Sequence, residues 1–339
     1  MKKMLLPLAA LFAAVTTTAL ADEYTIHDLE ELQVFMEYVH SYDFQGDTIY
    51  LAADIDCQGG RFNTGDPEYP STFAGTFDGQ GHTIRNFVHT PAGSGNYGYG
   101  VAMFDYAETG ATIKNLTLEG SLSGEYHNGA YSAPFVLAAE GPLSLLMDNC
   151  HFRGGVTNYY HAGGLVGFAS PGAGFEEYPS VILTNCTVEA DVLATGYYIA
   201  GGLVAKGTGV QAYDCSVSGY VYAQSNAGGL FAEAFDCTVE RCSFSGRLDG
   251  GPTGGSVVMP RYDNYGCGGL VGFASNSVFR ACSADAENTW TFVPNGGITY
   301  EFTAPGGAAG LTLGETAFFD CTATGSIDSR RCRAGGFVG

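Results

Sequence analysis

The sequence predicts an all-β protein folded as a parallel β-helix with an N-terminal capping helix. Three observations predict it. A Gly-Gly-Leu pattern recurs along the chain at intervals of 26 to 41 residues, a Cys follows three of the copies at the same distance of 12 residues, and polar and apolar residues alternate after each such Cys. Alternation with period two is typical of strands, and units that cannot bury their own apolar face are stabilised by stacking.

The first 21 residues have the pattern of a secretory signal peptide. Lys2 and Lys3 precede an apolar run over residues 4–15, and Ala19–Ala21 forms a small-residue cleavage site. This run is too short to span a membrane. We therefore expect the mature chain to begin near Asp22 and to be exported to the cell surface or the extracellular space, where cysteines can be oxidised.

The composition limits the class of partner. The chain of 339 residues has 35 Asp and Glu against 14 Lys and Arg, which gives a formal net charge of -21. Binding of nucleic acid or anionic lipid needs clustered positive charge, so the acidity argues against both. No later run reaches 18 apolar residues, and we expect no membrane span in this chain.

The N-terminal region, residues 22–95, is predicted to hold a cap and the first coils. A helix is expected over residues 25–40, followed by a strand over Thr48–Ala52. The apolar positions of the helix recur every three to four residues: Leu29, Leu32, Phe35 or Met36, and Val39. Its solvent-facing side is expected to carry Glu30, Glu31 and Glu37.

The repeat region, residues 96–339, is predicted to stack coils of about 20–26 residues, each with two or three short strands. Intervals of 26 and 27 residues are too short for the blades of a β-propeller, which need about 40–50. Paired glycines are expected where the backbone turns tightly or approaches its neighbour closely. These predicted structural turns are Gly163, Gly164, Gly201, Gly202, Gly228, Gly229, Gly268, Gly269, Gly335 and Gly336.

Six cysteines share one position of the repeat. We predict that they form a reduced ladder inside the core: Cys150, Cys186, Cys215, Cys242, Cys282 and Cys321. A disulfide set or metal site is the alternative, but the spacings do not resemble those of zinc ligands, and near-parallel side chains orient sulfurs poorly for bonding. The redox states of Cys57, Cys237, Cys267 and Cys332 stay open, including a bridge between the last two.

The repeated Gly-Gly-Leu-Val-Gly segments, together with LAADID at 51–56 and FAGTFDGQGHTI at 73–84, resemble the GLUG motif, named for Gly-Leu-any-Gly. This motif occurs in bacterial surface and adhesin-like proteins and in the N-terminal region of IgA-specific metallopeptidases. The two patterns together cover roughly residues 22–339. The resemblance implies a right-handed β-helix on an exported protein, and it implies no catalytic residues.

Asp54, Asp56 and Asp78 are the carboxylates that most suggest chemistry. They could form a Ca²⁺ site or an acid–base pair, as in polysaccharide lyases and hydrolases. Turn formation is the favoured alternative, because Asp side chains bond nearby backbone and Asp-Gly is a strong turn former. The sequence lacks His-Glu-x-x-His and Gly-x-Ser-x-Gly. We predict no catalytic residues, no metal site and no cofactor, with Ca²⁺ left open without support.

Tyrosines cluster just before the paired glycines and are the predicted ligand-binding residues. They are Tyr159, Tyr160, Tyr197, Tyr198 and Tyr265, with Tyr97 and Tyr99 as earlier equivalents. Stacked coils would align them into an exposed stripe suited to sugar rings or a protein. Ordinary aromatic packing along the sheet is the alternative.

These observations favour a non-enzymatic, adhesin-like scaffold that binds a glycan or a host surface protein. One alternative is a polysaccharide-active lyase or hydrolase, which would need a carboxylate or Lys/Arg cluster on one outer face. Another is the N-terminal spacer of a larger surface enzyme such as a metallopeptidase. The sequence stops within a repeat, at Phe337–Gly339, so we also expect it to be a fragment.

Overall fold

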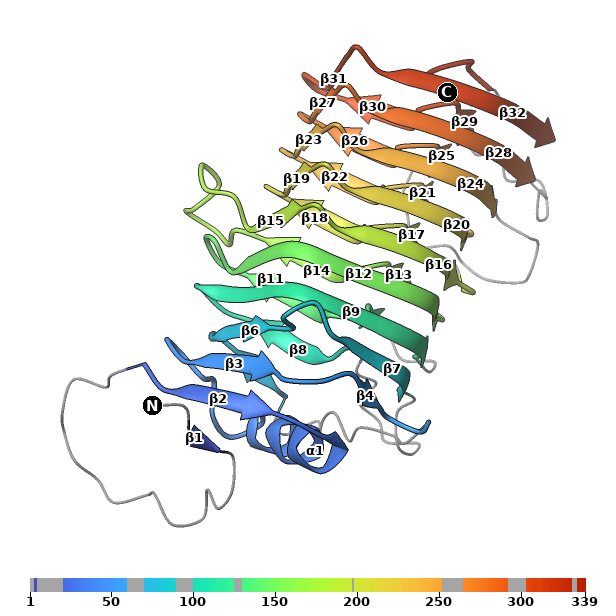
Figure 1. The fold of residues 1–339 in the computed structure, drawn as a ribbon. Coiled ribbons are helices and arrows are strands. Elements are labelled where there is room, and N and C mark those ends of the chain that lie inside the picture. The colour runs from blue at the N-terminus through green and yellow to red at the C-terminus, as the bar shows by residue number, and fades with distance from the viewer. Residues whose placement is uncertain are drawn as a thin grey trace.

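The computed structural model shows the predicted all-β fold, a parallel β-helix whose coils stack upward from one N-terminal helix (Figure 1). The structure describes residues 3–4, 21–59, 70–89, 100–124, 130–196, 198–251, 265–291, 303–330 and 334–339. Strands of successive coils pair in parallel and in register, as where Ser216 pairs with Ser243 and Val204 with Phe231. No helix in these ranges is long and apolar enough to cross a membrane.

A complete coil has four strands, which place four faces around the core, and we number the faces in chain order. Face 1 consists of β2 (Glu23–Ile26), β3 (Thr48–Leu51), β6 (Thr76–Asp78), the first halves of β9 (Ala111–Ser123) and β12 (Leu145–Asn158), β15 (Val181–Thr184), β19 (Gln211–Tyr213), β23 (Thr238–Glu240), β27 (Val278–Arg280) and β31 (Ala317–Phe319). Face 2 consists of β4 (Ile55–Asp56), β7 (Thr83–His89), the second halves of β9 and β12, β16 (Thr187–Ala194), β20 (Ser216–Ala223), β24 (Ser243–Gly250), β28 (Ser283–Thr291) and β32 (Thr322–Arg330).

The other two faces have shorter strands. Face 3 consists of β10 (Tyr131–Ser132), β13 (His161–Gly163), β17 (Ala200–Gly201), β21 (Ala227–Gly228), β25 (Tyr265–Gly268) and β29 (Thr303–Gly306). Face 4 consists of β5 (Thr72–Phe73), β8 (Phe104–Ala107), β11 (Val136–Glu140), β14 (Val166–Ser170), β18 (Val204–Thr208), β22 (Phe231–Phe235), β26 (Val271–Ser275) and β30 (Ala309–Leu313).

The coil is larger than the sequence predicts. Where faces 1 and 2 are separate strands the coil has four strands rather than two or three, and within the repeat region the shortest step between coils is the 27 residues from Ser216 to Ser243. The sequence pattern does not show the turn between the strands of faces 1 and 2, where Asn185, Asp214 and their equivalents adopt a φ near +54°. A single residue in this left-handed region turns the chain without Gly or Pro, so the pattern shows no gap there.

The capping helix α1 (Leu29–Tyr38) closes the N-terminal end of the core. It is shorter than the predicted 25–40, because residues 25 and 26 belong to β2 and Asp28 is the N-cap, whose side chain accepts from the Glu31 amide. Glu31 is buried rather than solvent-facing, since its carboxylate accepts from the His27 amide at 2.7 Å and contacts His27 Nδ1 at 2.9 Å.

The strand predicted at 48–52 is confirmed as β3. The backbone of β1 (Lys3–Met4) pairs with β2. Residues 5–20, which contain most of the predicted signal peptide, lie outside the described residues, so the leader stays a prediction.

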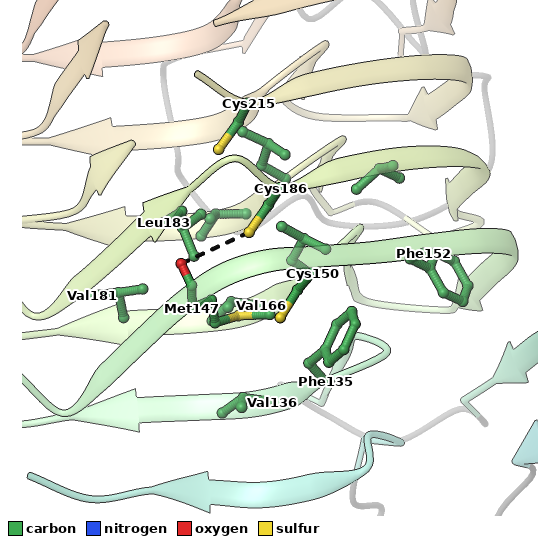
Figure 2. Packing of buried hydrophobic residues seen from close by; sticks show 14 of the residues in the cluster. Phe135, Val136, Met147, Cys150, Phe152, Val166, Val181, Leu183, Cys186 and Cys215 are labelled. Carbon is green, nitrogen blue, oxygen red and sulfur yellow. Dashed lines mark hydrogen bonds between the residues drawn. The ribbon is translucent and has the colours of Figure 1, made fainter. Parts of the chain in front are cut away.

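The six predicted ladder cysteines occupy one register position at the bend between faces 1 and 2, which we call the thiol corner. Figure 2 shows three of them in a column, Cys150, Cys186 and Cys215. The register aligns all six, and all are buried except Cys321, which is partly exposed on the last described coil. The six are unpaired thiols in the structure. The reduced state of this ladder stays a prediction.

Each thiol of the corner donates to the carbonyl two residues before it. Cys242 Sγ lies 3.3 Å from the Glu240 carbonyl and 3.5 Å from the Ala212 carbonyl of the coil below, and Cys186 repeats this pattern with Thr184 and Met147 (Figure 2). A small side chain with one weak donor therefore fits this position, which explains the recurring Asn-Cys and Asp-Cys pairs.

A second corner, between faces 4 and 1, uses the same device. Cys237 Sγ donates to the Gly207 and Phe235 carbonyls, and in the next coil Ser277 Oγ donates to the Ala234 and Ser275 carbonyls. Cys237 is a buried thiol, and so is Cys57, which follows β4 on face 2. Burial raises the pKa of each to about 12. Cys267 is buried on face 3, and Cys332 lies outside the described residues, so a bridge between these two stays open.

The paired glycines lie between faces 3 and 4, where backbones meet too closely for a side chain. A Cβ on Gly202 would collide with the carbonyl oxygen of Gly229, and one on Gly201 would collide with that of Val204. None of the predicted pairs has a left-handed φ, so close approach and not left-handed geometry requires glycine here. Gly336 is the exception, with nothing near its Cβ position on the last described coil.

Candidate functional site

Faces 3 and 4 approach each other closely on the outer side of the β-helix, where a Cβ on Gly266 would collide with the Gly272 carbonyl oxygen, and we call this strip the crease. Its floor is a column of small residues that point outward yet are buried: Gly167, Ala205, Ala232 and Gly272. Ala205, Ala232 and Ile199 form a small apolar cluster of their own, separate from the main core, with Tyr131 packed against it. The Gly-Gly turns are therefore accompanied by a small apolar cluster on the outer side of the coil.

Aromatic rings line the wall of the crease that belongs to face 3. The rings of Tyr131 and His161 stack with centroids 4.3 Å apart and planes 22° apart, because β10 and β13 place them in register. The Tyr198 ring lies edge-on to the His161 ring, with centroids 4.9 Å apart. It is tilted against the Tyr160 ring, with centroids 4.3 Å apart. These four residues form a continuous aromatic cluster, with Phe168 of face 4 at 5.5 Å from Tyr131.

The imidazole of His161 is neutral at physiological pH. Burial, with a smaller contribution from the positive charge of Lys206, lowers the pKa of His161 to about 3. Its Nδ1 atom is buried and meets no hydrogen-bond partner among the described residues. His161 therefore contributes to the cluster as an uncharged ring.

Charged and amide groups continue the crease beyond the aromatic cluster. Lys206 Nζ lies 3.6 Å from a Glu233 carboxylate oxygen, and Asn226 donates to the other oxygen at 2.9 Å. The Asn226 carbonyl in turn accepts from the Gly266 amide at 2.8 Å, which fixes the side chain. The arrangement offers apolar ring faces beside fixed donors and acceptors, a combination suited to noncovalent recognition.

The structure brings together some of the predicted tyrosines and separates others. Tyr160 and Tyr198 are in contact, and Tyr159 meets Tyr160 edge-on at 5.1 Å. Tyr160 is only 6 % exposed, which differs from the exposed stripe that the spacing predicts, because its ring packs beneath its neighbours. Tyr197, Tyr97 and Tyr99 lie outside the described residues, and only the backbone of Tyr265 is described. Ligand binding by these tyrosines stays a prediction.

Sequence reasoning missed Tyr131 and His161, the best-stacked pair of the crease. Neither belongs to a Tyr-Tyr pair, and Tyr131 precedes residue 160, where the repeat pattern is degraded. The signal that could have found them is register, since each comes directly before a small residue that starts the face 3 turn.

A concave feature lies on face 2, over the strands β24, β28 and β32. A groove of about 520 Å³ runs over β24, β28 and β32, with Gly246, Ala286 and Gly325 as its floor. Its flanks carry Arg247, Asp285 and Glu287, and the remaining lining residues are Ser245 and Ser326. The sequence pattern did not predict this charged cluster, because its members come from three coils separated by insertions of different length.

The three aspartates near the N-terminus form turns and cross-coil bonds, which agrees with the favoured interpretation. Asp56 accepts from the Gln58 amide and the Asn86 side chain, both at 2.8 Å, and Asp78 accepts from the Gln80 amide at 2.9 Å. Asp54 accepts from the Thr83 amide at 3.0 Å, and this bond lowers the pKa of its carboxyl. Within the described ranges, no three His, Cys, Asp or Glu residues gather as metal ligands would.

The fold and the crease define a parallel β-helix with an external strip of aromatic side chains. No family model matches the chain, and no curated protein gives a significant sequence match, so the resemblance to GLUG repeats stays a prediction. Among solved structures, the chain is similar to a Bacteroides ovatus protein described as a "putative immunoglobulin A1 protease". The TM-score is 0.50 at 16% identity, over 94% of this chain and 84% of that one. At this identity the likeness extends to the fold alone.

Proposed function

We propose that this chain is an exported, non-enzymatic β-helix scaffold that binds a carbohydrate ligand through the crease. One observation carries the proposal: a partly exposed ring cluster of Tyr131, His161 and Tyr198 lies beside the fixed polar groups of Asn226 and Glu233. Ring faces pack against the apolar side of a sugar, while amide and carboxylate groups bond its hydroxyls. The predicted signal peptide supports export.

The experiment is a glycan array probed with the purified chain and two variants. Tyr131→Ala combined with Tyr198→Ala removes ring faces of the crease, whereas Tyr222→Ala removes a partly buried tyrosine of face 2 and is the matched control. We expect the double variant to lose at least about tenfold in affinity, or roughly 1.4 kcal/mol, and the control to bind as wild type. Equal binding by the double variant would refute the crease as the site.

The charged groove on face 2 favours a second candidate, a polysaccharide-active enzyme. Ser245 pairs with Asp285 and Arg247 with Glu287, so carboxylates and a guanidinium share one outer face. Two carboxylates flanking a sugar can act as acid and base. A reducing-sugar assay on neutral and uronic polysaccharides, with Asp285→Asn and Glu287→Gln as controls, decides this candidate: turnover lost in both variants would establish it.

The description of the structural neighbour suggests a third role, in which this chain is the β-helix portion of a larger surface protease. Incubation of the purified chain with immunoglobulin A1, followed by electrophoresis, tests whether it cleaves that protein alone. The scaffold proposal predicts intact immunoglobulin, and cleavage would replace it with a proteolytic function.

A further inference from the structure

One corner of the β-helix exposes apolar side chains without a local reason. Among the described residues, seven large apolar side chains are at least 40 % exposed, and four lie at the corner between faces 4 and 1: Leu143, Leu146, Phe175 and Tyr178. We call these four the corner patch. They come from two adjacent coils, because the Leu143 amide donates to the Pro179 carbonyl at 2.8 Å and Leu146 pairs with Ile182.

The other three exposed side chains have local explanations. The Tyr42 hydroxyl donates to Asp47 at 3.0 Å, and its ring packs edge-on against Phe44. Leu313 and Phe319 lie on the last described coil, where no described coil covers them. The corner patch lies in the middle of the stack, with coils on both sides.

An insertion at residues 171–180, between β14 and β15, carries Phe175 and Tyr178. In Figure 1 this loop stands out from the stack, beyond the tight turns of the neighbouring coils. Its C-terminal end is anchored in both directions, since the Ser144 amide donates to the Ser180 carbonyl and the Ser180 amide donates to the Gly209 carbonyl, each at 2.9 Å. The coil register is therefore kept while the loop projects.

The loop is ordered by its own hydrogen bonds. The Phe175 amide donates to the Gly172 carbonyl at 3.3 Å, and the Tyr178 amide donates to the Phe175 carbonyl at 2.9 Å. The Glu176 carboxylate accepts from the Gly174 amide at 3.0 Å, a bond that lowers the pKa of this carboxyl. Two consecutive turns thus hold Phe175 and Tyr178 outward, at 46 % and 47 % exposure, and binding through them would cost little ordering entropy.

The surroundings of the patch are acidic. Residues 140–146 and 171–182 contain Glu140, Glu176 and Glu177 and no Lys or Arg. A projecting apolar knob with an acidic rim complements a protein pocket that is apolar inside and cationic at its edge. Leu143 and Leu146 offer nothing to sugar hydroxyls, and the carboxylates would be repelled by anionic membranes. We propose that the corner patch docks a partner protein through an apolar pocket flanked by Lys or Arg.

The test uses an array of synthetic peptides of defined sequence as the probe. One set places Leu and Phe between Lys or Arg, and a second set replaces every Lys and Arg with Glu. The chain is compared with Phe175→Ser/Tyr178→Ser, with Glu176→Gln/Glu177→Gln, and with Leu313→Ser/Phe319→Ser as the control of equal exposure. Unchanged thermal unfolding verifies the fold of each variant.

We expect basic apolar peptides to bind wild type and the control equally, and to bind the Phe175→Ser/Tyr178→Ser variant at least about tenfold more weakly. The Glu176→Gln/Glu177→Gln variant should bind more weakly at low salt and lose part of the salt dependence. Equal binding by all variants, equal binding of the Glu peptides, or no peptide binding would overturn the proposal. Patch-dependent binding on a glycan array instead would assign the patch to carbohydrate. None of these outcomes involves the crease, so the two proposals fail separately.

Discussion

The thiol corner and the crease both recur along the stack, yet they place different groups at the turn. At the thiol corner the chain bends around the core, and the side chain after the bend points inward, where Cys150 to Cys282 are almost fully buried. At the crease the chain brings backbones together, so that Gly201 and Gly202 meet other backbones and a column of small residues is buried beside them.

This difference separates stability from recognition. The thiol corner keeps one residue type over six coils, because at each position the thiol lies within hydrogen-bonding distance of the carbonyl two residues before it. The wall of the crease changes at every coil, from Tyr131 to His161, Ile199 and Asn226. A position that varies on a fixed scaffold is one that can acquire binding specificity.

The largest effect is expected from filling the close approach beneath the crease. A side chain at Gly229 would collide with the Gly269 carbonyl and the Phe244 ring, so Gly229→Val should lower the free energy of unfolding by about 3 kcal/mol. Gly336 has open space at its Cβ position, so Gly336→Val should change it by less than about 0.5 kcal/mol. Denaturant unfolding measures both, and equal losses would contradict the close-approach explanation.

A smaller loss is expected at the thiol corner. Cys215→Ala leaves a cavity and removes the donor to the Tyr213 carbonyl, which should cost about 1–2 kcal/mol in denaturant unfolding. Cys215→Ser should cost less, because Ser277 already makes the equivalent bonds at the second corner. Cys321→Ala, on a partly exposed position, is the control with the smallest cost. A Ser variant less stable than the Ala variant would argue against the hydrogen-bonding role.

The buried imidazole of the crease makes stability depend on pH. Because the pKa of His161 falls to about 3 in the folded chain, the unfolded chain binds the extra proton between about pH 6.5 and pH 3. Stability should therefore fall on acidification, by up to about 1.4 kcal/mol per pH unit from this group. His161→Phe should remove that part of the slope when thermal unfolding at pH 7 and pH 4.5 is compared. An identical pH dependence of stability in both proteins would mean that His161 is exposed to solvent in the folded chain.

The smallest effect is expected from alkylation of the native chain, which tests the burial of the thiols without any substitution. Hydrogen bonding between neighbouring thiols raises the pKa of Cys186, Cys215 and Cys242, and burial raises that of Cys282 to about 12. Iodoacetamide at pH 8 should therefore modify the partly exposed Cys321 before any of them. Mass spectrometry of partly labelled chain identifies the order, and early labelling of Cys215 would show that the corner opens.

Sequence patterns predicted the coil-building positions well, because these positions repeat the same physical requirement. The Asn-Cys and Gly-Gly pairs mark the bend and the close approach, and both lie where the spacing places them. The four-stranded coil was missed, since a left-handed Asn or Asp leaves no break in the apolar pattern. The crease and the charged groove were missed in part, because Tyr131 meets His161, and Arg247 meets Glu287, only through a register that insertions conceal.

The most direct measurement compares the crease and the thiol corner in one experiment. Glycan-array binding and thermal unfolding are recorded for Tyr131→Ala/Tyr198→Ala and for Cys215→Ala. The crease variant should lose at least about tenfold in binding while unfolding close to the wild-type temperature, and the corner variant should unfold several degrees lower while binding as wild type. Normal binding by Tyr131→Ala/Tyr198→Ala, or loss of binding by a folded Cys215→Ala, would contradict the assignment of recognition to the crease.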